Sequence, residues 1–198
     1  MIKLKEIIVE TDVSKYKTWY HVNTRYLGPT NIFKPEIPTY TRLKGEDKRT
    51  PRVSVTHDWR NAIHMLIILY SSQYWYVYET NEVPIDPVAR RLELLQQKKI
   101  RSTSNDFRSP DAEVGAEAWF LEPIKMKYSG IVDIGRDAIL RLKMSMGMSD
   151  GGINYKKLKL EPNLTHPKTT YFMGKEYDYD EFHKNIFGKD EDSRGNKI

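Results

Sequence analysis

Short runs of β-favouring residues, each soon interrupted, limit the fold of this chain more than any other feature. The runs cover residues 19–22, 52–56, 74–79, 117–122 and 129–134. Gly28-Pro29 closes the first run, and Pro84 and Pro123 stop two of the others. Because the strands are short and long helices are few, the pattern predicts an α+β fold with a short, mostly antiparallel (split) sheet and a few flanking helices.

Helical spacing is clearest over residues Trp59–Tyr70, where apolar positions such as Ile63 and Ile67 recur on one face. Thr56 or Asp58 is placed to cap the N-terminus of this helix. We expect three further helices at 86–98, 137–146 and 179–187, and a basic strand or hairpin at 153–160. Residues 29–51 are expected to form a long connection.

A chain of 198 residues has room for one ordinary domain. We expect a single α+β domain over residues 1–187, with its core at 19–134 and a C-terminal extension at 135–187. Residues 188–198 are expected to form a charged, flexible tail. The sequence has no cysteine, which excludes disulfides, thiolate metal ligands and cysteine nucleophiles.

The expected location is the cytoplasm, and no membrane partner is expected. No apolar run approaches the roughly 20 residues that a membrane-spanning helix requires. The first six residues mix charged with apolar side chains and do not form the apolar segment of a signal peptide. If a phage encodes the chain, the location becomes the cytoplasm of its host.

The formal net charge of +5 arises from 32 Lys and Arg against 27 Asp and Glu, and the two signs are segregated along the chain. Basic residues gather at 34–60 and 141–160, whereas acidic residues gather at 176–192. Basic loops favour phosphate-bearing partners such as RNA or DNA, although an ordinary solvated surface has the same composition. The side chains that would contact a nucleic acid are Arg42, Lys44, Lys48, Arg49, Arg52, Lys156 and Lys157.

Histidines are the residues from which a metal or catalytic site would be built here. His57 and His64 are two helical turns apart rather than at the i, i+4 spacing of a metal-binding pair, so we expect no metal. His21 differs because it follows Trp19-Tyr20 in a short strand. A histidine at a strand end can present a ring nitrogen to a ligand hydroxyl, or it can simply bond a neighbouring carbonyl.

Four short motifs occur in a fixed order along the first two thirds of the chain. They are Tyr-His-Val at 20–22, Arg-Val-Ser-Val-Thr at 52–56, Tyr-Val-Tyr-Glu at 76–79 and Gly-Ala-Glu-Ala-Trp-Phe-Leu-Glu-Pro-Ile at 115–124. In this order the motifs resemble the ADP-ribosyltransferase-like fold over roughly residues 19–134. The chain is also similar to uncharacterised phage and bacterial proteins with a pattern like Glu46-Asp47…Thr50-Pro51-Arg52-Val53.

The resemblance implies that NAD is the substrate, and it assigns roles to four residues. A histidine on the first core strand binds the NAD ribose, and His21 occupies that place. Ser54 and Thr56 match the strand that supports the nicotinamide pocket. Glu117 matches the glutamate that holds the ribose 2′-hydroxyl and stabilises the positive charge that develops when the nicotinamide–ribose bond breaks.

Two positions depart from the pattern of the family. Its histidine-type members place a nicotinamide-stacking tyrosine near the second motif strand, whereas this chain has Tyr74, Tyr76 and Tyr78 further on, of which Tyr76 is our candidate. The residue two before Glu117, which selects the acceptor in the family, is Gly115. Glycine has no side chain to act as a base, so the acceptor of the ADP-ribose stays undefined.

Two functional hypotheses result. The first is an NAD-dependent ADP-ribosyl transferase or NAD glycohydrolase-like protein that serves as a phage accessory or host-takeover factor. The alternative is a non-catalytic, phage-type binding protein that engages a host protein or a nucleic acid through basic, aromatic loops. The first hypothesis predicts that His21, Ser54 or Thr56, and Glu117 converge on one cleft with a ring from residues 74–78 over it, because groups that act on one ribose must reach hydrogen-bond distance together.

Overall fold

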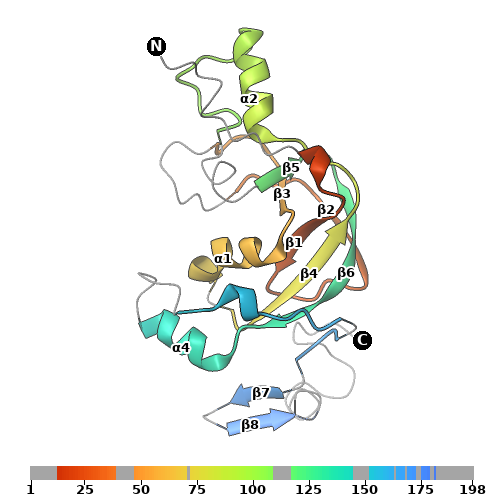
Figure 1. Cartoon of the computed structure of the whole chain (residues 1–198), viewed down its shortest axis with the longest axis vertical. Coiled ribbons are helices and arrows are strands. Elements are labelled where there is room, and N and C mark those ends of the chain that lie inside the picture. The colour runs from red at the N-terminus through yellow and green to blue at the C-terminus, as the bar shows by residue number, and fades with distance from the viewer. Residues whose placement is uncertain are drawn as a thin grey trace.

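The structure is a computed structural model that describes residues 13–38, 47–70, 72–108, 117–144, 152–162, 164–167, 169–172, 175–178 and 181. At its centre is a six-stranded sheet in the order β2-β6-β4-β1-β3-β5, in which every neighbouring pair is antiparallel (Figure 1). The strands are β1 (Trp19–Asn23), β2 (Thr30–Phe33), β3 (Val53–Thr56), β4 (Tyr74–Thr80), β5 (Glu117–Phe120) and β6 (Ile124–Asp133). The predicted α+β class with an antiparallel sheet is therefore confirmed.

The sheet is nearly divided between β1 and β3. β1 pairs with β4 along its whole length, from Trp19 to Asn23, and β3 pairs with β5 along its whole length. Between β1 and β3, however, the register contains the single pair Tyr20↔Thr56. The remaining backbone groups of β1 and β3 therefore diverge, and the sheet consists of a four-stranded part and a two-stranded part joined at one point.

Helices cover one face of the four-stranded part. α1 (Trp59–Tyr70), α4 (Arg136–Met144) and the 3-10 helix η3 (Tyr155–Lys157) lie on the same side of the sheet (Figure 1). The apolar core between them and the sheet includes Ile63 and Ile67 of α1 together with Trp75 and Val77 of β4, all of which are fully buried. The spacing of Ile63 and Ile67 thus directs one side of α1 into the core.

The opposite face of the sheet has its own apolar core. Because strand side chains alternate between faces, Tyr76 and Tyr78 of β4 point away from Trp75 and Val77 and pack with Trp19 and Phe33. Each sheet face is therefore buried separately, as expected for a sheet whose strands are apolar on both sides.

Helix α2 (Pro87–Gln96) begins at a complete capping site. Asp86 Oδ1 accepts hydrogen bonds from the backbone N–H groups of Val88 at 2.8 Å and Ala89 at 3.2 Å, and Pro87 occupies the first turn. The helix lies at the opposite end of the molecule from the hairpin of β7 (Thr169–Phe172) and β8 (Lys175–Asp178) (Figure 1). The short 3-10 helix η2 (Val13–Lys15) precedes β1.

Several expected elements differ in the structure. Strand β2 forms inside the expected long connection at 29–51, because residues 30–33 pair with β6. The segment at 153–160 contains η3 rather than a strand or hairpin, and it packs apolar side chains such as Ile153 in the core beside the sheet. The next residue, Glu161, forms an isolated backbone bridge with Ile131. Apart from Glu181, the helix expected at 179–187 and the tail at 188–198 lie outside the described residues.

Within the described ranges, no helix combines the length and the apolar character that are needed to cross a bilayer.

Gly130 gives a test of how closely the 152–162 segment packs on β6. A Cβ atom at this position would lie 2.5 Å from the carbonyl oxygen of Glu161, whose backbone exchanges two hydrogen bonds with Ile131. We expect Gly130→Ala to lower the free energy of unfolding by about 2 kcal/mol or more in urea denaturation. Gly135→Ala is the control, because it has positive φ but no atom within 4 Å. Equal effects of the two substitutions would contradict the close approach.

Candidate functional site

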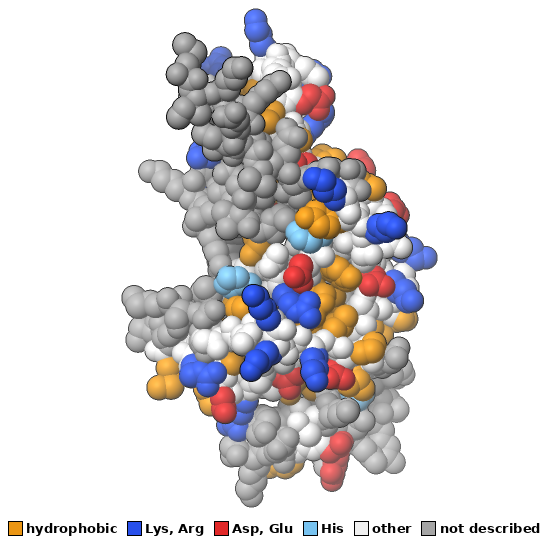
Figure 2. All heavy atoms as spheres, in the orientation of Figure 1, with side chains coloured by type: hydrophobic (Ala, Val, Ile, Leu, Met, Phe, Trp, Pro, Cys, Tyr) orange, Lys and Arg blue, Asp and Glu red, His pale blue; other side chains and the backbone are white. Residues whose placement is uncertain are grey.

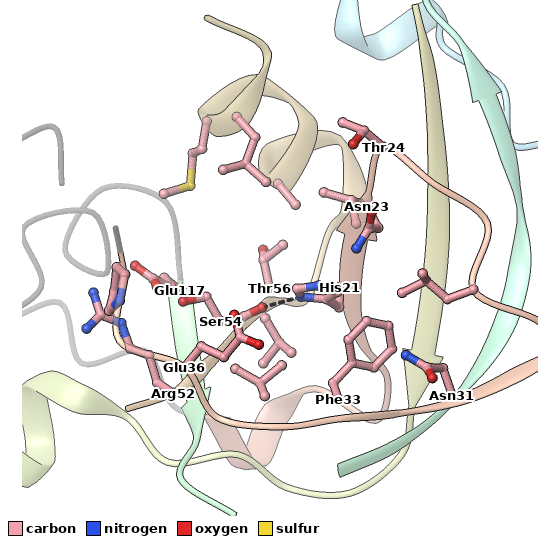
Figure 3. A pocket seen from close by; sticks show the side chains of 18 of the residues that line it. His21, Asn23, Thr24, Asn31, Phe33, Glu36, Arg52, Ser54, Thr56 and Glu117 are labelled. Atoms are coloured by element: carbon pink, nitrogen blue, oxygen red, sulfur yellow. Dashed lines mark hydrogen bonds between the residues drawn. The ribbon is translucent and has the colours of Figure 1, made fainter. Parts of the chain in front are cut away.

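A cleft opens where β1 and β3 diverge. It encloses a cavity of about 690 Å³, within the range of roughly 300–1,000 Å³ that is typical of small-molecule sites. The cavity is lined by β1, β3 and β5, by the segment from β2 to Pro38, and by one side of α1. Four of the five residues predicted to handle NAD line it, namely His21, Ser54, Thr56 and Glu117 (Figure 3).

His21 lies at the point where the ladder between β1 and β3 stops. Its Nδ1 is 2.9 Å from the carbonyl oxygen of Ser54 (Figure 3). A carbonyl oxygen can only accept a hydrogen bond, so Nδ1 is the protonated nitrogen and Nε2 of the neutral ring is an acceptor. Burial lowers the pKa of His21, and the bond to Ser54 opposes this effect only in part. The neutral ring also contacts Phe33, with 4.5 Å between the ring centroids.

Ser54 and Thr56 lie on the same side of β3, facing Glu117 and Trp119 of β5 through the cross-strand pairs Thr56↔Glu117 and Ser54↔Trp119. Thr56 is buried, and its Oγ1 accepts a hydrogen bond from the backbone N–H of Asp58 at 3.3 Å. This contact holds the start of α1 against the end of β3. Thr56 therefore shapes the cleft through the position of α1 in addition to lining it.

Glu117 is a buried carboxylate at the wall of the cleft, with 8% of its surface exposed. Its Oε1 accepts a hydrogen bond of 2.9 Å from the indole Nε1–H of Trp119. A buried carboxylate needs such donors, because burial of a charged group without partners is costly. Figure 3 shows Glu117 and His21 entering the cleft from different strands, with Ser54 and Thr56 between them.

Tyr76, the fifth predicted residue, lies elsewhere. It is buried on the opposite face of β4, where its ring lies 6.1 Å from that of Tyr26 and 6.4 Å from that of Tyr128. The aromatic side chains that do line the cleft include Phe33 and Tyr70, and Tyr70 is 52% exposed. Trp75 lines the cleft from the face of the sheet that α1 covers, whereas His21 and Phe33 line it from the face that also carries Tyr76. Tyr76 stays out of the cleft because its ring packs against those of Tyr26 and Tyr128.

The structure separates the residues of the nucleic-acid hypothesis. Lys156 and Lys157 are exposed in η3, and Lys48 and Arg49 are exposed in the turn before β3. Arg52 is 5% exposed, and its guanidinium lies 4.2 Å from the centre of the Trp119 ring. Arg52 therefore contacts the protein interior instead of solvent. Arg42 and Lys44 lie outside the described residues, as does Gly115.

Asp47 organises the turn that leads into β3. Its fully buried carboxylate accepts hydrogen bonds from the backbone N–H groups of Arg49 at 2.7 Å, Thr50 at 3.0 Å and Phe107 at 2.7 Å, and from the hydroxyl of Thr50. Burial opposes ionisation, but these donors outweigh it and hold the pKa of Asp47 below its usual value. The carboxylate thereby ties the turn at 47–50 to the loop that contains Phe107.

The pattern Glu46-Asp47…Thr50-Pro51-Arg52-Val53 is the sequence signal that could have identified the turn before β3 as part of the site. Arg52 donates through Nη1 to the backbone oxygen of Asp47 at 3.0 Å, so the two residues form one unit. The carboxylate of Glu36 also lines the cleft, and its backbone pairs with that of Arg52 through hydrogen bonds of 3.2 and 3.0 Å. Glu36 lies in a segment with neither helical nor strand periodicity, so the sequence pattern does not identify it as a site residue.

Among the described residues, no group of three or more His, Asp or Glu side chains is arranged to hold a metal ion. No protein-family model, curated protein or solved structure matches the chain.

Asp47 leads to a pH-dependent prediction. Because its folded-state pKa lies below the unfolded value of about 3.9, its contribution to stability is complete above that value and is lost as the pH falls through the folded-state pKa. We expect Asp47→Asn to lower the free energy of unfolding by on the order of 2 kcal/mol at pH 7. The difference from the wild type should shrink toward pH 3 in urea titrations.

Asp106→Asn is the matched control, since Asp106 lies in the neighbouring loop and its backbone oxygen, not its carboxylate, accepts the hydrogen bond from Arg91. A difference between Asp47→Asn and the wild type that stays constant from pH 7 to pH 3 would contradict the proposed role of the ionised carboxylate.

Proposed function

We propose that this chain binds NAD in the cleft between β1 and β3 and cleaves the bond between nicotinamide and ribose, so that ADP-ribose passes to water or to an acceptor nucleophile. The supporting observation is that His21, Ser54, Thr56 and Glu117, which come from three different strands, line one cavity. The resemblance to the ADP-ribosyltransferase-like fold assigned His21 and Glu117 to the ribose of NAD, and Ser54 and Thr56 to the nicotinamide pocket. Their common location supports the proposal, although none of Tyr74, Tyr76 and Tyr78 lines the cavity.

Glu117 would supply the electrostatic part of the reaction. When the nicotinamide–ribose bond breaks, nicotinamide leaves with the bonding electron pair and positive charge develops at the anomeric carbon and ring oxygen. A carboxylate fixed at the cleft wall stabilises that charge more in the transition state than in the ground state. Attack by water or another nucleophile, with loss of its proton, then completes the reaction.

His21 and Ser54 would orient the ribose. With Nδ1 bonded to the Ser54 carbonyl, Nε2 of His21 can accept a hydrogen bond from a sugar hydroxyl. The hydroxyl of Ser54 is a donor and an acceptor on the adjacent wall. Phe33 and Tyr70 give the cleft the aromatic surface on which the planar nicotinamide or adenine ring can pack.

The acceptor would be decided at the open side of the same cleft. Glu36 lines this region and is exposed, so a carboxylate is present near the reacting centre although Gly115 has no side chain. Both transfer and hydrolysis release nicotinamide, so nicotinamide is the product that tests the proposal. The fate of ADP-ribose then distinguishes a transferase from a glycohydrolase.

The first test compares Glu117→Gln with Glu122→Gln. Glu122 is an exposed carboxylate just beyond β5 and does not line the cleft, which makes it the matched control. We expect Glu117→Gln to reduce nicotinamide release by about 100-fold or more, because the amide cannot stabilise the developing charge. Glu122→Gln should release nicotinamide at the wild-type rate. Chromatography of the released nicotinamide provides the measurement.

NAD binding is measured separately, as the shift of thermal unfolding at increasing NAD concentration. Wild type and both variants should be stabilised to a similar extent, since the substitution at Glu117 removes charge and little volume. Wild-type protein that neither releases nicotinamide nor is stabilised by NAD would refute the proposed function.

A second candidate function is nucleic-acid binding, favoured by the exposed lysines Lys156, Lys157 and Lys159 and by Arg60, whose guanidinium donates to the backbone oxygen of Leu158. Figure 2 shows Lys and Arg side chains gathered in the middle of one face of the molecule. If these residues contact phosphates, affinity for a DNA or RNA duplex must fall steeply between about 50 and 200 mM salt. Replacement of all three lysines by Gln should reduce this salt dependence. Binding that is absent at low salt would eliminate this candidate.

A further inference from the structure

We propose that Trp119 is a positioning residue for Glu117, and that its indole N–H fixes the direction in which the Glu117 carboxylate enters the cleft. This inference rests on the proposed cleavage of NAD. The two residues are separated by one position on β5, so strand alternation places both side chains on the same face. The Nε1–H of Trp119 then reaches Oε1 of Glu117 at 2.9 Å in a buried environment.

Trp119 is well suited to this role because its indole ring is held from several directions. The residue is fully buried, and its backbone exchanges hydrogen bonds of 2.8 and 3.0 Å with Ile85. The guanidinium of Arg52 lies over the indole ring at 4.2 Å, and the ring of Phe107 lies 5.8 Å away at an angle of 30°. A ring confined in this way has one orientation, so its N–H has one direction.

The position of Arg52 depends in turn on Asp47. The backbone oxygen of Asp47 accepts a hydrogen bond from Arg52, and the carboxylate of Asp47 binds the N–H of Phe107. Asp47 therefore holds both groups that contact the Trp119 ring. A cation over the face of an indole also attracts its π electrons, which strengthens the N–H as a donor to a carboxylate.

The contact with Trp119 explains why Arg52 is buried. An arginine on a basic surface loop would be expected to point into solvent, whereas Arg52 packs on the ring that donates to Glu117. Trp119 is not among the residues that line the cavity, whereas Arg52 is. The effect of Trp119 on the reaction therefore passes through the carboxylate of Glu117.

The decisive variant is Trp119→Phe, which keeps an aromatic ring beneath Arg52 and removes the indole N–H. We expect kcat for nicotinamide release to fall by about tenfold or more, while the NAD concentration at half-maximal thermal stabilisation changes by less than about twofold. A merely structural loss would weaken NAD binding and kcat together. The split between kcat and binding therefore reports positioning.

Trp19→Phe is the matched control. Trp19 is also fully buried, but it does not line the cleft, and its Nε1 has no hydrogen-bond partner among the described residues. The substitution Trp19→Phe should leave kcat for nicotinamide release unchanged. In a double-mutant cycle, Trp119→Phe should have no further effect on kcat in a Glu117→Gln background, because the carboxylate that it orients is absent.

A spectroscopic measurement covers the case in which Trp119→Phe is unfolded at the assay temperature. The indole ¹⁵N–¹H signal of Trp119 should move to a lower proton shift in Glu117→Gln, and the signal of Trp19 should not move. An unmoved Trp119 signal, or equal kcat values for Trp119→Phe and Trp19→Phe, would overturn this inference and leave NAD cleavage standing. Absence of nicotinamide release by the wild type would instead refute the proposed function and this inference with it.

Discussion

The hydrogen bond between the His21 side chain and the Ser54 carbonyl marks the point on which the cleft depends. After the pair Tyr20↔Thr56, the backbones of β1 and β3 no longer match, and their polar groups need other partners. The imidazole satisfies one of these groups and keeps the two strands connected without closing the gap between them. The same bond fixes the tautomer of His21. It therefore both holds β1 and β3 at this separation and leaves Nε2 of His21 as a hydrogen-bond acceptor.

The walls of the cleft are attached to this point by short, local contacts. The hydroxyl of Thr56 binds the backbone of Asp58 and so places α1 directly after β3. On the other wall, β5 pairs with β3 and places Glu117 opposite Thr56. Residues that are distant in sequence thus face one cavity because two strand pairings and one turn set their positions, while the buried cores on both sheet faces hold the strands in place.

A buried polar cluster supports the wall that contains Glu117. Asp47, Arg52 and Trp119 are each nearly or fully buried, although two of them are charged residues. Asp47 has enough donors to remain ionised, and Arg52 lies between the backbone of Asp47 and the indole of Trp119. A charged cluster at this depth is costly unless its members satisfy one another, and hydrophobic replacements would often be at least as stable. Its presence behind a proposed catalytic carboxylate is therefore better explained by orientation of that carboxylate than by stability alone.

Local sequence signals, namely apolar spacing and a capping residue, predicted the helices α1 and α2. The apolar spacing of Ile63 and Ile67 gave α1 its bounds at Trp59 and Tyr70, and Asp86 marked the start of α2. Strand β2 was missed because residues 30–33 have little strand pattern of their own and are stabilised by pairing with β6. The segment at 153–160 was expected to be a strand, but it packs apolar side chains such as Ile153 in the core beside the sheet, and an isolated backbone bridge at Glu161 follows it.

The sequence made His21, Ser54, Thr56 and Glu117 candidates through the resemblance of its motif order to the ADP-ribosyltransferase-like fold, and the strand patterns placed these residues on short strands. Periodicity could not determine which aromatic side chain of β4 lines the cleft: Tyr76 was selected, but Trp75 lines it and Tyr76 packs against Tyr26 and Tyr128. It also could not reveal that Arg52 is buried, because a basic residue in a loop has the same sequence signature in solvent and over an indole ring. Those decisions belong to the tertiary structure, because they depend on which strands pair, where the pairing of β1 and β3 ends, and which distant loop Asp47 binds.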